Sequence, residues 1–188
     1  MTTEEDGMFS SDQKSRLLSL ARNALVTHFE QQRLDLPTDE VFSHKYGVFV
    51  TLHIGDELRG CIGYIRGYKP LATSVVEMAK AAAFRDPRFA PVEKYELEKL
   101  TIEISVLGEL IEMQASEMPV IGRDGLYISH PYGSGLLLPQ VAVEWGWDSS
   151  TFLREVCRKA GLNPDAHLDK KSRLYRFAAE VFNENDTF

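Results

Sequence analysis

The sequence predicts an α+β protein with an antiparallel sheet built from two hairpin-helix-strand repeats and flanked by helices. Two segments rich in strand-forming residues, 47–65 and 125–138, each contain a glycine-bearing turn that is typical of a β-hairpin. Each hairpin precedes a helical pattern and then a further strand, an order that favours antiparallel pairing. The 188 residues are 44% hydrophobic and 26% charged, which is ordinary for a globular protein with its own core.

The first half of the chain contains four predicted elements with recognisable boundaries. Ser10 and Gln13 have the spacing of a capping box, and apolar residues then recur at helical intervals. Gly55 marks the hairpin turn, and Pro70 suits the first turn of a helix that the loop RDPRFAPV ends. The predicted elements are a helix over 10–32, a hairpin over 47–65, a helix over 70–84 and a strand over 99–109.

The second half repeats this order. The segment GLYIS at 125–129 matches GVFVT at 47–51 in residue type, and chance similarity between two hairpins is the alternative to duplication. Gly161 is placed to end a helix. The predicted elements are a strand over 125–130, a turn over 131–135, a return strand with its extension over 136–147, a helix over 149–161 and a closing strand over 172–182.

We expect these elements to form a single domain, because no linker divides the two halves cleanly. The repeat units should superimpose and contribute to one antiparallel sheet. The predicted boundaries are a flexible N-terminus at 1–9, one domain at 10–183 with repeat units at about 47–108 and 125–182, and a tail at 184–188.

Composition limits the classes of function. The formal net charge of −7 argues against a broad, nonspecific nucleic-acid surface, and no apolar stretch is long enough to indicate a membrane span. The acidic start MTTEEDG is unlike an export signal, so we expect a cytoplasmic protein with reduced cysteines. The five histidines fit no metal motif, and we expect neither metal nor cofactor. His53 and His130, which each end the first strand of a hairpin, are interpreted as turn-flanking residues.

The segment LRGCIGYIRGYKP at 58–70 is the candidate functional site. On a regular strand Arg59 and Cys61 share one face, and Gly63 leaves room beside them. A nearby guanidinium favours the thiolate, which is the reactive form of cysteine, so Cys61 is the candidate catalytic residue. The alternative is a small buried cysteine in a strand whose glycines are imposed by a β-bulge.

Cations gather near this segment although the chain as a whole is acidic, which favours an anionic ligand. The glycines precede a helix N-terminus, where free amides suit an anion, although their spacing fits no phosphate-binding motif. Asp86 could orient Arg88 through a local ion pair. Ordinary exposed surface charge is the alternative for each cation. The candidate ligand-binding residues here are Arg59, Gly60, Gly63, Arg85, Asp86 and Arg88.

Three further features lie in the second half. Gln140 and Glu144 are polar groups in an apolar run and are second-rank ligand-binding candidates. Trp145 and Trp147 are interpreted as core aromatics, with stacking on a ligand as the alternative. Cys157 lies on an apolar helical stripe, which predicts a buried core thiol.

Six motifs follow one another in an order that resembles the AMMECR-domain family, the protein A component of the AmmeMemoRadiSam system. The resemblance covers nearly the whole chain. It implies one antiparallel sheet built from two related repeats, which is covered by helices and divided into two unequal lobes. It implies no particular reaction, because the family has none firmly assigned. It does imply a pathway shared with Memo-like and radical S-adenosylmethionine proteins, beside which prokaryotic members are often encoded. The motifs are LRGCIG (58–63), DPRF (86–89), IEISVL (102–107), IGRDGL (121–126), GLLLPQVA (135–142) and EWGWD (144–148).

The leading hypothesis is a cleft around LRGCIG and the loop RDPRF that binds an anionic small molecule or a modified residue. Any catalysis would use Cys61, and whether the protein is an enzyme stays open. The alternative is a noncatalytic adaptor that uses LRGCIG as a surface for a partner protein. A third hypothesis is RNA binding through local cations, which the net charge and the lack of an aromatic-interleaved basic stripe disfavour.

Overall fold

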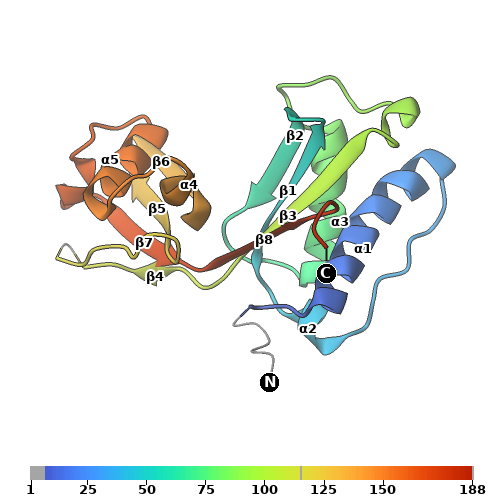
Figure 1. The fold of residues 1–188 in the computed structure, drawn as a ribbon, viewed down its shortest axis with the longest axis horizontal. Helices are drawn as coiled ribbons and strands as arrows, with labels where there is room; N and C mark the ends of the chain where they lie inside the picture. The colour runs from blue at the N-terminus through green and yellow to red at the C-terminus, as the bar shows by residue number, and fades with distance from the viewer. Residues whose placement is uncertain (1–6, 115, 188) are drawn as a thin grey trace. The chain divides into compact units, whose positions relative to one another are not determined.

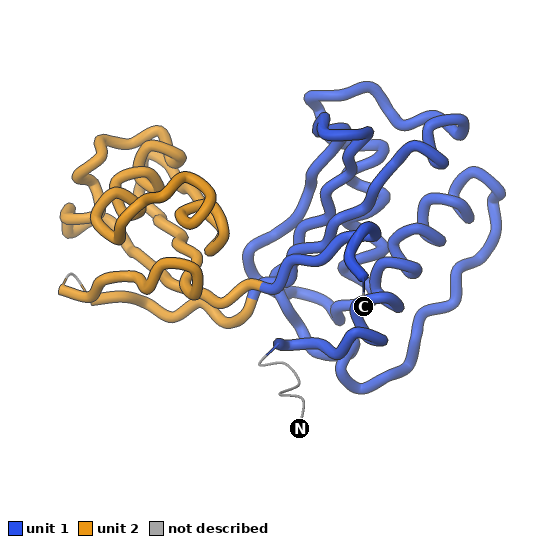
Figure 2. The backbone as a smooth tube through the Cα atoms, in the orientation of Figure 1, with its two compact units in different colours: residues 1–107, 180–188 blue, residues 108–179 orange. Residues whose placement is uncertain are grey.

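Two antiparallel sheets of four strands each, with their own helices, make up the α+β fold of the computed structural model (Figure 1). The structure describes residues 7–114 and 116–187. The chain forms two compact units, which Figure 2 colours separately. Unit 1 contains the described residues up to Leu107 and from Glu180 onward, and unit 2 contains Gly108–Ala179.

Unit 1 buries one face of its sheet under two long helices. Alternate residues of the central strand, Val48, Val50 and Leu52, are fully buried, as the period of two in a strand requires. The first helix starts at the predicted capping box of Ser10 and Gln13. The sheet order is β2-β1-β3-β8, with β1 Gly47–Ile54, β2 Glu57–Tyr64, β3 Leu100–Leu107 and β8 Ala179–Asn183. The helices are α1 Ser11–Glu30, α2 Glu40–Ser43, α3 Leu71–Phe84 and the 3-10 helix η1 Lys94–Glu96.

Unit 2 has a separate hydrophobic core between its sheet and one amphipathic helix. Leu126 and Ile128 from the central strand pack in one cluster with Phe152, Val156 and Cys157 from that helix. The sheet order is β4-β7-β5-β6, with β4 Ile111–Glu112, β5 Gly125–His130, β6 Gly133–Leu137 and β7 Arg173–Phe177. The helices are α4 Pro139–Glu144, α5 Ser149–Lys159 and the 3-10 helix η2 Ala166–Leu168.

The hairpin-helix-strand order occurs twice, once in each sheet. Strands β2-β1-β3 in unit 1 and β6-β5-β7 in unit 2 follow the same spatial order, with the third strand paired to the first. The predicted α+β class with antiparallel pairing is confirmed. The predicted single sheet is wrong, because the two hairpins belong to separate four-stranded sheets.

The fourth strand of each sheet follows the third strand of the other sheet along the chain. Strand β4 comes after β3 but pairs with β7, and β8 comes after β7 but lies beside β3. The predicted closing strand over 172–182 is therefore two strands, interrupted at Ala178, whose carbonyl accepts a hydrogen bond from the N–H of Gly108. Strand β4 was not predicted, because two residues carry no detectable period.

The run LLLPQVAVEWGW does not continue as a strand. Residues 139–144 form α4, which starts at Pro139, where the missing N–H costs no helical hydrogen bond. Gly133 and Gly135, predicted as turn residues, lie in β6. The apolar residues around Pro139, three leucines before it and two valines after it, therefore gave the start of this helix a strand-like pattern.

Both predicted terminal segments contain ordered contacts. Phe9 is buried, and its backbone N–H donates to the carboxylate of Glu180. Glu184, placed in the predicted tail, accepts two hydrogen bonds from Arg22 and one from the N–H of Ile102. Residues 1–6 of the predicted flexible N-terminus lie outside the described residues.

In each unit a glycine of the hairpin allows close approach to the end of a helix. A Cβ atom at Gly60 in β2 would collide with the backbone carbonyl of Ala82 in α3. A Cβ atom at Gly135 in β6 would collide with the backbone of Ala160, the C-cap of α5. These strand glycines therefore serve backbone packing, for which no larger residue leaves room.

Gly60→Ala should lower the free energy of unfolding by about 1 to 3 kcal/mol, because the added methyl group must displace the α3 backbone. Urea denaturation followed by circular dichroism measures the change. Gly108→Ala is the matched control, since its Cβ would lie 3.3 Å from the nearest atom, the carbonyl oxygen of Ala178. An equal loss in both variants would contradict the close-approach explanation.

Candidate functional site

The loop after α3 satisfies the open edge of strand β2 at Cys61. Strand β2 is the outermost strand of its sheet, so part of its backbone lacks a neighbouring strand. The N–H of Cys61 donates to Oδ2 of Asp86 at 2.9 Å, and the carbonyl of Cys61 accepts from Nη2 of Arg88 at 3.3 Å. Side chains of the DPRF motif thus replace the missing strand at the centre of LRGCIG.

Asp86 is a buried carboxylate with four hydrogen bonds from the chain. The Arg88 side chain donates from Nε to Oδ1 at 3.0 Å and from Nη2 to Oδ2 at 2.7 Å, and its backbone N–H donates to Oδ1 at 3.1 Å. The Arg88 guanidinium, together with the Cys61 N–H, holds the pKa of Asp86 well below its usual range. Asp86 is 1% exposed and Arg88 is 54% exposed, so a buried anion orients a cation at the surface.

Arg59 is held by a second carboxylate. Its Nε and Nη2 donate to Glu96 at 2.8 and 3.0 Å, and its Nη1 donates to the carbonyl of Ala90 at 3.0 Å. This hydrogen-bonded ion pair lowers the pKa of Glu96 and is mostly buried. Arg59 therefore fastens β2 to residues 90–96, and it is less available to a ligand than Arg88.

The regular alternation predicted through β2 is interrupted at Arg59. The register shifts so that Leu52 faces Gly60 while His53 faces Leu58, and Arg59 has no opposite residue. The space predicted beside Gly63 is filled, because a Cβ there would collide with the ring of Phe49 and with the backbone carbonyl oxygen of Val48. The expectation that Gly63 opens a cleft is therefore wrong.

The two cysteines have different environments. Cys61 is partly exposed, and its sulfur accepts a hydrogen bond from the Thr51 hydroxyl at 3.3 Å. Cys157 is fully buried in the core of unit 2, as predicted, and burial raises the pKa of its thiol. The accessible thiol of the pair is therefore Cys61.

The remaining candidates lie at other places. Arg85 is exposed at the C-cap of α3, beside Asp86 in sequence. Gln140 and Glu144 belong to α4 in unit 2, whereas Cys61 and the DPRF loop belong to unit 1. Trp145 is 70% exposed, so its predicted place in the core is wrong. Trp147 packs against the core of unit 2, as expected.

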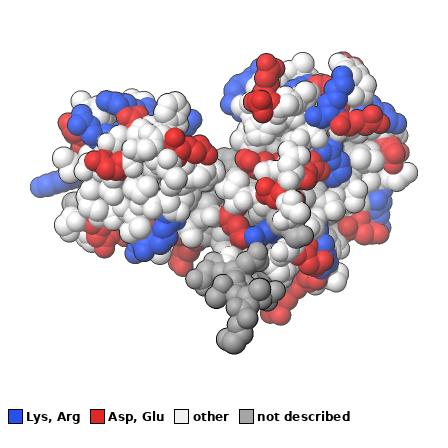
Figure 3. Space-filling view, viewed as in Figure 1, with Lys and Arg blue, Asp and Glu red and all other residues white. Residues whose placement is uncertain are grey.

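The described residues contain no group of three or more metal-ligating side chains that could hold an ion. Within residues 7–114 and 116–187, no helix is long and apolar enough to cross a bilayer. On the face drawn in Figure 3, acidic and basic side chains are interspersed. This mixture gives no support to a continuous nucleic-acid surface there.

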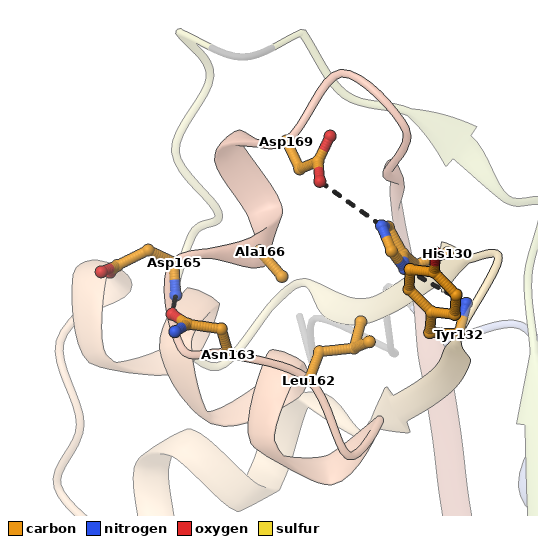
Figure 4. A pocket seen from close by; sticks show the side chains of 7 residues that line it. All are labelled: His130, Tyr132, Leu162, Asn163, Asp165, Ala166 and Asp169. Carbon is orange, nitrogen blue, oxygen red and sulfur yellow. Dashed lines mark hydrogen bonds and ion pairs between the residues drawn. The ribbon is translucent and has the colours of Figure 1, made fainter.

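A cavity in unit 2 was not predicted from the sequence. Its wall includes His130 at the end of β5, Tyr132 in the hairpin turn, and Asp169 after η2 (Figure 4). His130 was noted in the sequence but interpreted as turn-flanking. No local pattern could pair it with Asp169, because the two are brought together by tertiary structure.

These observations define a class of protein with two antiparallel sheets and flanking helices. In this class a buried carboxylate binds the backbone of an edge strand, and the same carboxylate orients an exposed guanidinium that lies beside a thiol. The family model described as AMMECR1 matches residues 18–182. The chain therefore belongs to the AMMECR1 family, as its motifs indicated.

Similar proteins match along nearly the whole chain. A protein of Methanothermobacter thermautotrophicus is 44% identical in an alignment of length 185 that covers 94% of this chain and 96% of the relative. Protein TK0174 of Thermococcus kodakarensis is 45% identical in an alignment of length 181 that covers 89% of this chain and 88% of the relative. The crystal structure of uncharacterized protein PH0010 from Pyrococcus horikoshii has a TM-score of 0.81 and 40% identity, covering 95% of both chains.

Asp86→Asn should lower the free energy of unfolding by about 2 kcal/mol at pH 7, because the amide loses charge-assisted bonds to Arg88 and to the Cys61 N–H. The folded pKa of Asp86 lies below the unfolded value of about 3.9. Its stabilisation is therefore complete above the unfolded pKa and is lost as the pH falls through the folded pKa.

The difference in stability between wild type and Asp86→Asn should thus stay constant from about pH 7 to 5 and shrink below about pH 4. Urea denaturation at each pH measures it. Asp35→Asn is the exposed control and should change stability little at any pH. A difference that grows as the pH falls would contradict the role given to Asp86.

Proposed function

We propose that the surface around Cys61 binds an anionic small molecule, or an anionic group on a modified residue, and that Arg88 makes the charged contact. The observation that carries this proposal is the pairing of a buried carboxylate with a half-exposed guanidinium next to an accessible thiol. An arginine whose orientation is fixed before the ligand arrives loses less side-chain entropy on binding.

The free part of the Arg88 guanidinium is suited to this contact. The bonds to Asp86 and to the Cys61 carbonyl use Nε and Nη2, which leaves the two N–H groups of Nη1 on the opposite side. Asp86 partly neutralises the charge, so modest affinity and strong geometric selection are expected. Cys61 is the nucleophile if the ligand is reactive, although binding does not require it.

Membership of the AMMECR1 family supports two wider parts of the proposal. The first is a role in a modification pathway with Memo-like and radical S-adenosylmethionine proteins. The second is a cytoplasmic location, where Cys61 stays reduced. In that pathway the anionic ligand would be a substrate, a product, or a modified residue of a partner.

The charge preference of the site can be measured without knowing the ligand. Iodoacetate and iodoacetamide alkylate the same thiolate, but only iodoacetate is anionic. The rate with iodoacetate divided by the rate with iodoacetamide should be higher at Cys61 than for free cysteine. Arg88→Ala should lower this ratio at Cys61 about threefold to fivefold, which is the effect expected when a charge about 4 Å from the reagent's carboxylate is removed near water. Time-resolved labelling with peptide mapping measures both rates.

Two controls define this test. Arg85→Ala removes an exposed cation from the same loop and should leave the ratio unchanged. Cys157 should stay unlabelled in the folded protein because it is fully buried. An unchanged ratio in Arg88→Ala, or an equal fall in Arg85→Ala, would refute anion attraction by Arg88.

A partner-binding module is the second candidate function, and the exposure of Trp145 favours it. Val143 on the same helix end is also exposed and lies beside Gly122, in the loop that carries the exposed Val120. Exposed tryptophans with apolar neighbours are common centres of protein interfaces. The proposed partner is the Memo-like or the radical S-adenosylmethionine protein.

Trp145→Ala should weaken retention of that partner more than tenfold in a pull-down of purified proteins, since buried interface tryptophans often contribute about 2 kcal/mol or more. Tyr68→Ala, which removes an exposed aromatic residue from unit 1, should have no effect. Failure of wild type to retain either partner would exclude this second candidate. Loss of retention in Arg88→Ala but not in Trp145→Ala would place the contact at the Cys61 surface instead.

A further inference from the structure

We propose that unit 2 carries a separate binding site for a neutral, hydroxyl-rich ring, such as a monosaccharide or the ribose of a nucleoside. The site is the cavity beside His130 (Figure 4). This site shares no residue with the Cys61 surface. An experiment that rejects the anion site proposed there would therefore leave this proposal unaffected.

The cavity has the size of a small-ligand site. Its volume is about 390 Å³, within the range of known ligand pockets. Apolar carbon is supplied by Leu162 and Ala166, and polar groups by His130, Asn163 and Asp169. Figure 4 shows Leu162 and Ala166 between the histidine side and the asparagine side of the space.

His130 presents a buried donor that the protein does not satisfy. Its side chain is 5% exposed, and Nε2 is buried without a hydrogen-bond partner among the described residues. Its Nδ1 accepts the backbone N–H of Tyr132 at 3.2 Å, so in the neutral ring the proton is on Nε2. A buried N–H without an acceptor is unfavourable, and a ligand oxygen would remove that penalty.

Asp169 faces this donor at a distance that falls short of a good hydrogen bond. Its Oδ2 lies 3.5 Å from Nε2 of His130, beyond the usual range for N–H···O bonds. Its Oδ1 accepts the N–H of Lys171 at 2.9 Å, and this bond is the largest contribution that lowers the pKa of Asp169. Asp169 is therefore an ionised acceptor, and its half-exposed side chain can move outward to widen the gap.

The two groups together select the chemistry of the ligand. An atom between them must accept from His130 Nε2–H and donate to the Asp169 carboxylate, which a hydroxyl group does. An anion would be repelled by Asp169, and no lysine or arginine lines the described cavity to offset that repulsion. A cation would leave the buried N–H of His130 unpaired.

The rest of the wall fits a ring that carries several hydroxyl groups. Tyr132 is 82% exposed, with its ring centroid 5.3 Å from that of His130, and it offers an aromatic face for the C–H side of a sugar. The side-chain oxygen of Asn163 accepts the N–H of Asp165 at 3.0 Å, which leaves its amide N–H groups as donors. In Figure 4 the carboxylate of Asp165 points away from the cavity.

Saturation-transfer difference NMR on the full chain tests this site with ribose, glucose and adenosine as probes. At least one probe should receive saturation at millimolar concentration, on its ring protons. If adenosine responds at both ribose and base protons while the free sugars do not, the source is a nucleoside; a response from glucose or ribose identifies a sugar. Tyr132→Ala and Asp169→Ala should each weaken binding about tenfold.

Matched variants make the outcome decisive. Tyr68→Ala, an exposed tyrosine in unit 1, and Arg88→Ala at the anion site should leave binding unchanged. The proposal is overturned if none of the three probes receives saturation, or if Tyr132→Ala and Asp169→Ala bind as wild type does. Displacement of the probe by spermidine at equal concentration would also overturn it, because it would show a cation site.

Discussion

The hydrogen bond from the Cys61 N–H to the buried Asp86 carboxylate is the interaction on which the surface around LRGCIG depends. An edge strand needs partners for its outward backbone groups, and here a side chain of the DPRF loop supplies the acceptor. The same carboxylate fixes the guanidinium of Arg88, which in turn donates to the Cys61 carbonyl. Protection of the strand edge and orientation of a surface cation are therefore one arrangement, and neither can be altered alone.

A second constraint on the structure is the close approach of an edge strand to a helix, which requires glycines in both hairpins. Gly60 meets the carbonyl of Ala82, and Gly135 meets the backbone of Ala160. Both contacts place the hairpin's second strand against the C-terminal end of a helix, α3 in unit 1 and α5 in unit 2. This shared requirement explains why glycines recur in both hairpins, and it assigns Gly60 to packing without invoking a ligand.

Local features of the fold could be predicted from the sequence because their determinants are close together in the chain. The capping box of Ser10 and Gln13 and the core stripe with Cys157 are local patterns, and both are present. The division into two sheets could not be predicted, because it depends on pairings such as that of β4 with β7. A two-residue strand has no period, and the interruption at Ala178 is visible only once both of its neighbours have partners.

The candidate site was predictable in composition but not in geometry. The motifs identified Arg59, Cys61, Asp86 and Arg88, and the structure places all four in unit 1. The sequence could not show that Glu96, 37 residues from Arg59, engages that guanidinium, or that a bulge at Arg59 interrupts the alternation. The same limit applies to His130, whose partner Asp169 is remote in sequence.

The two candidate sites use a carboxylate in opposite ways, and this difference determines what each can bind. Asp86 is paired to a guanidinium, so the group presented to a ligand is a cation. Asp169 stands 3.5 Å from Nε2 of His130, too far to satisfy it, so the groups presented there are a ring nitrogen and a carboxylate. Each site also belongs to a unit with its own hydrophobic cluster. An exposed side chain such as Tyr132 can therefore be replaced without loss of either core, which allows the role of unit 2 to be tested separately.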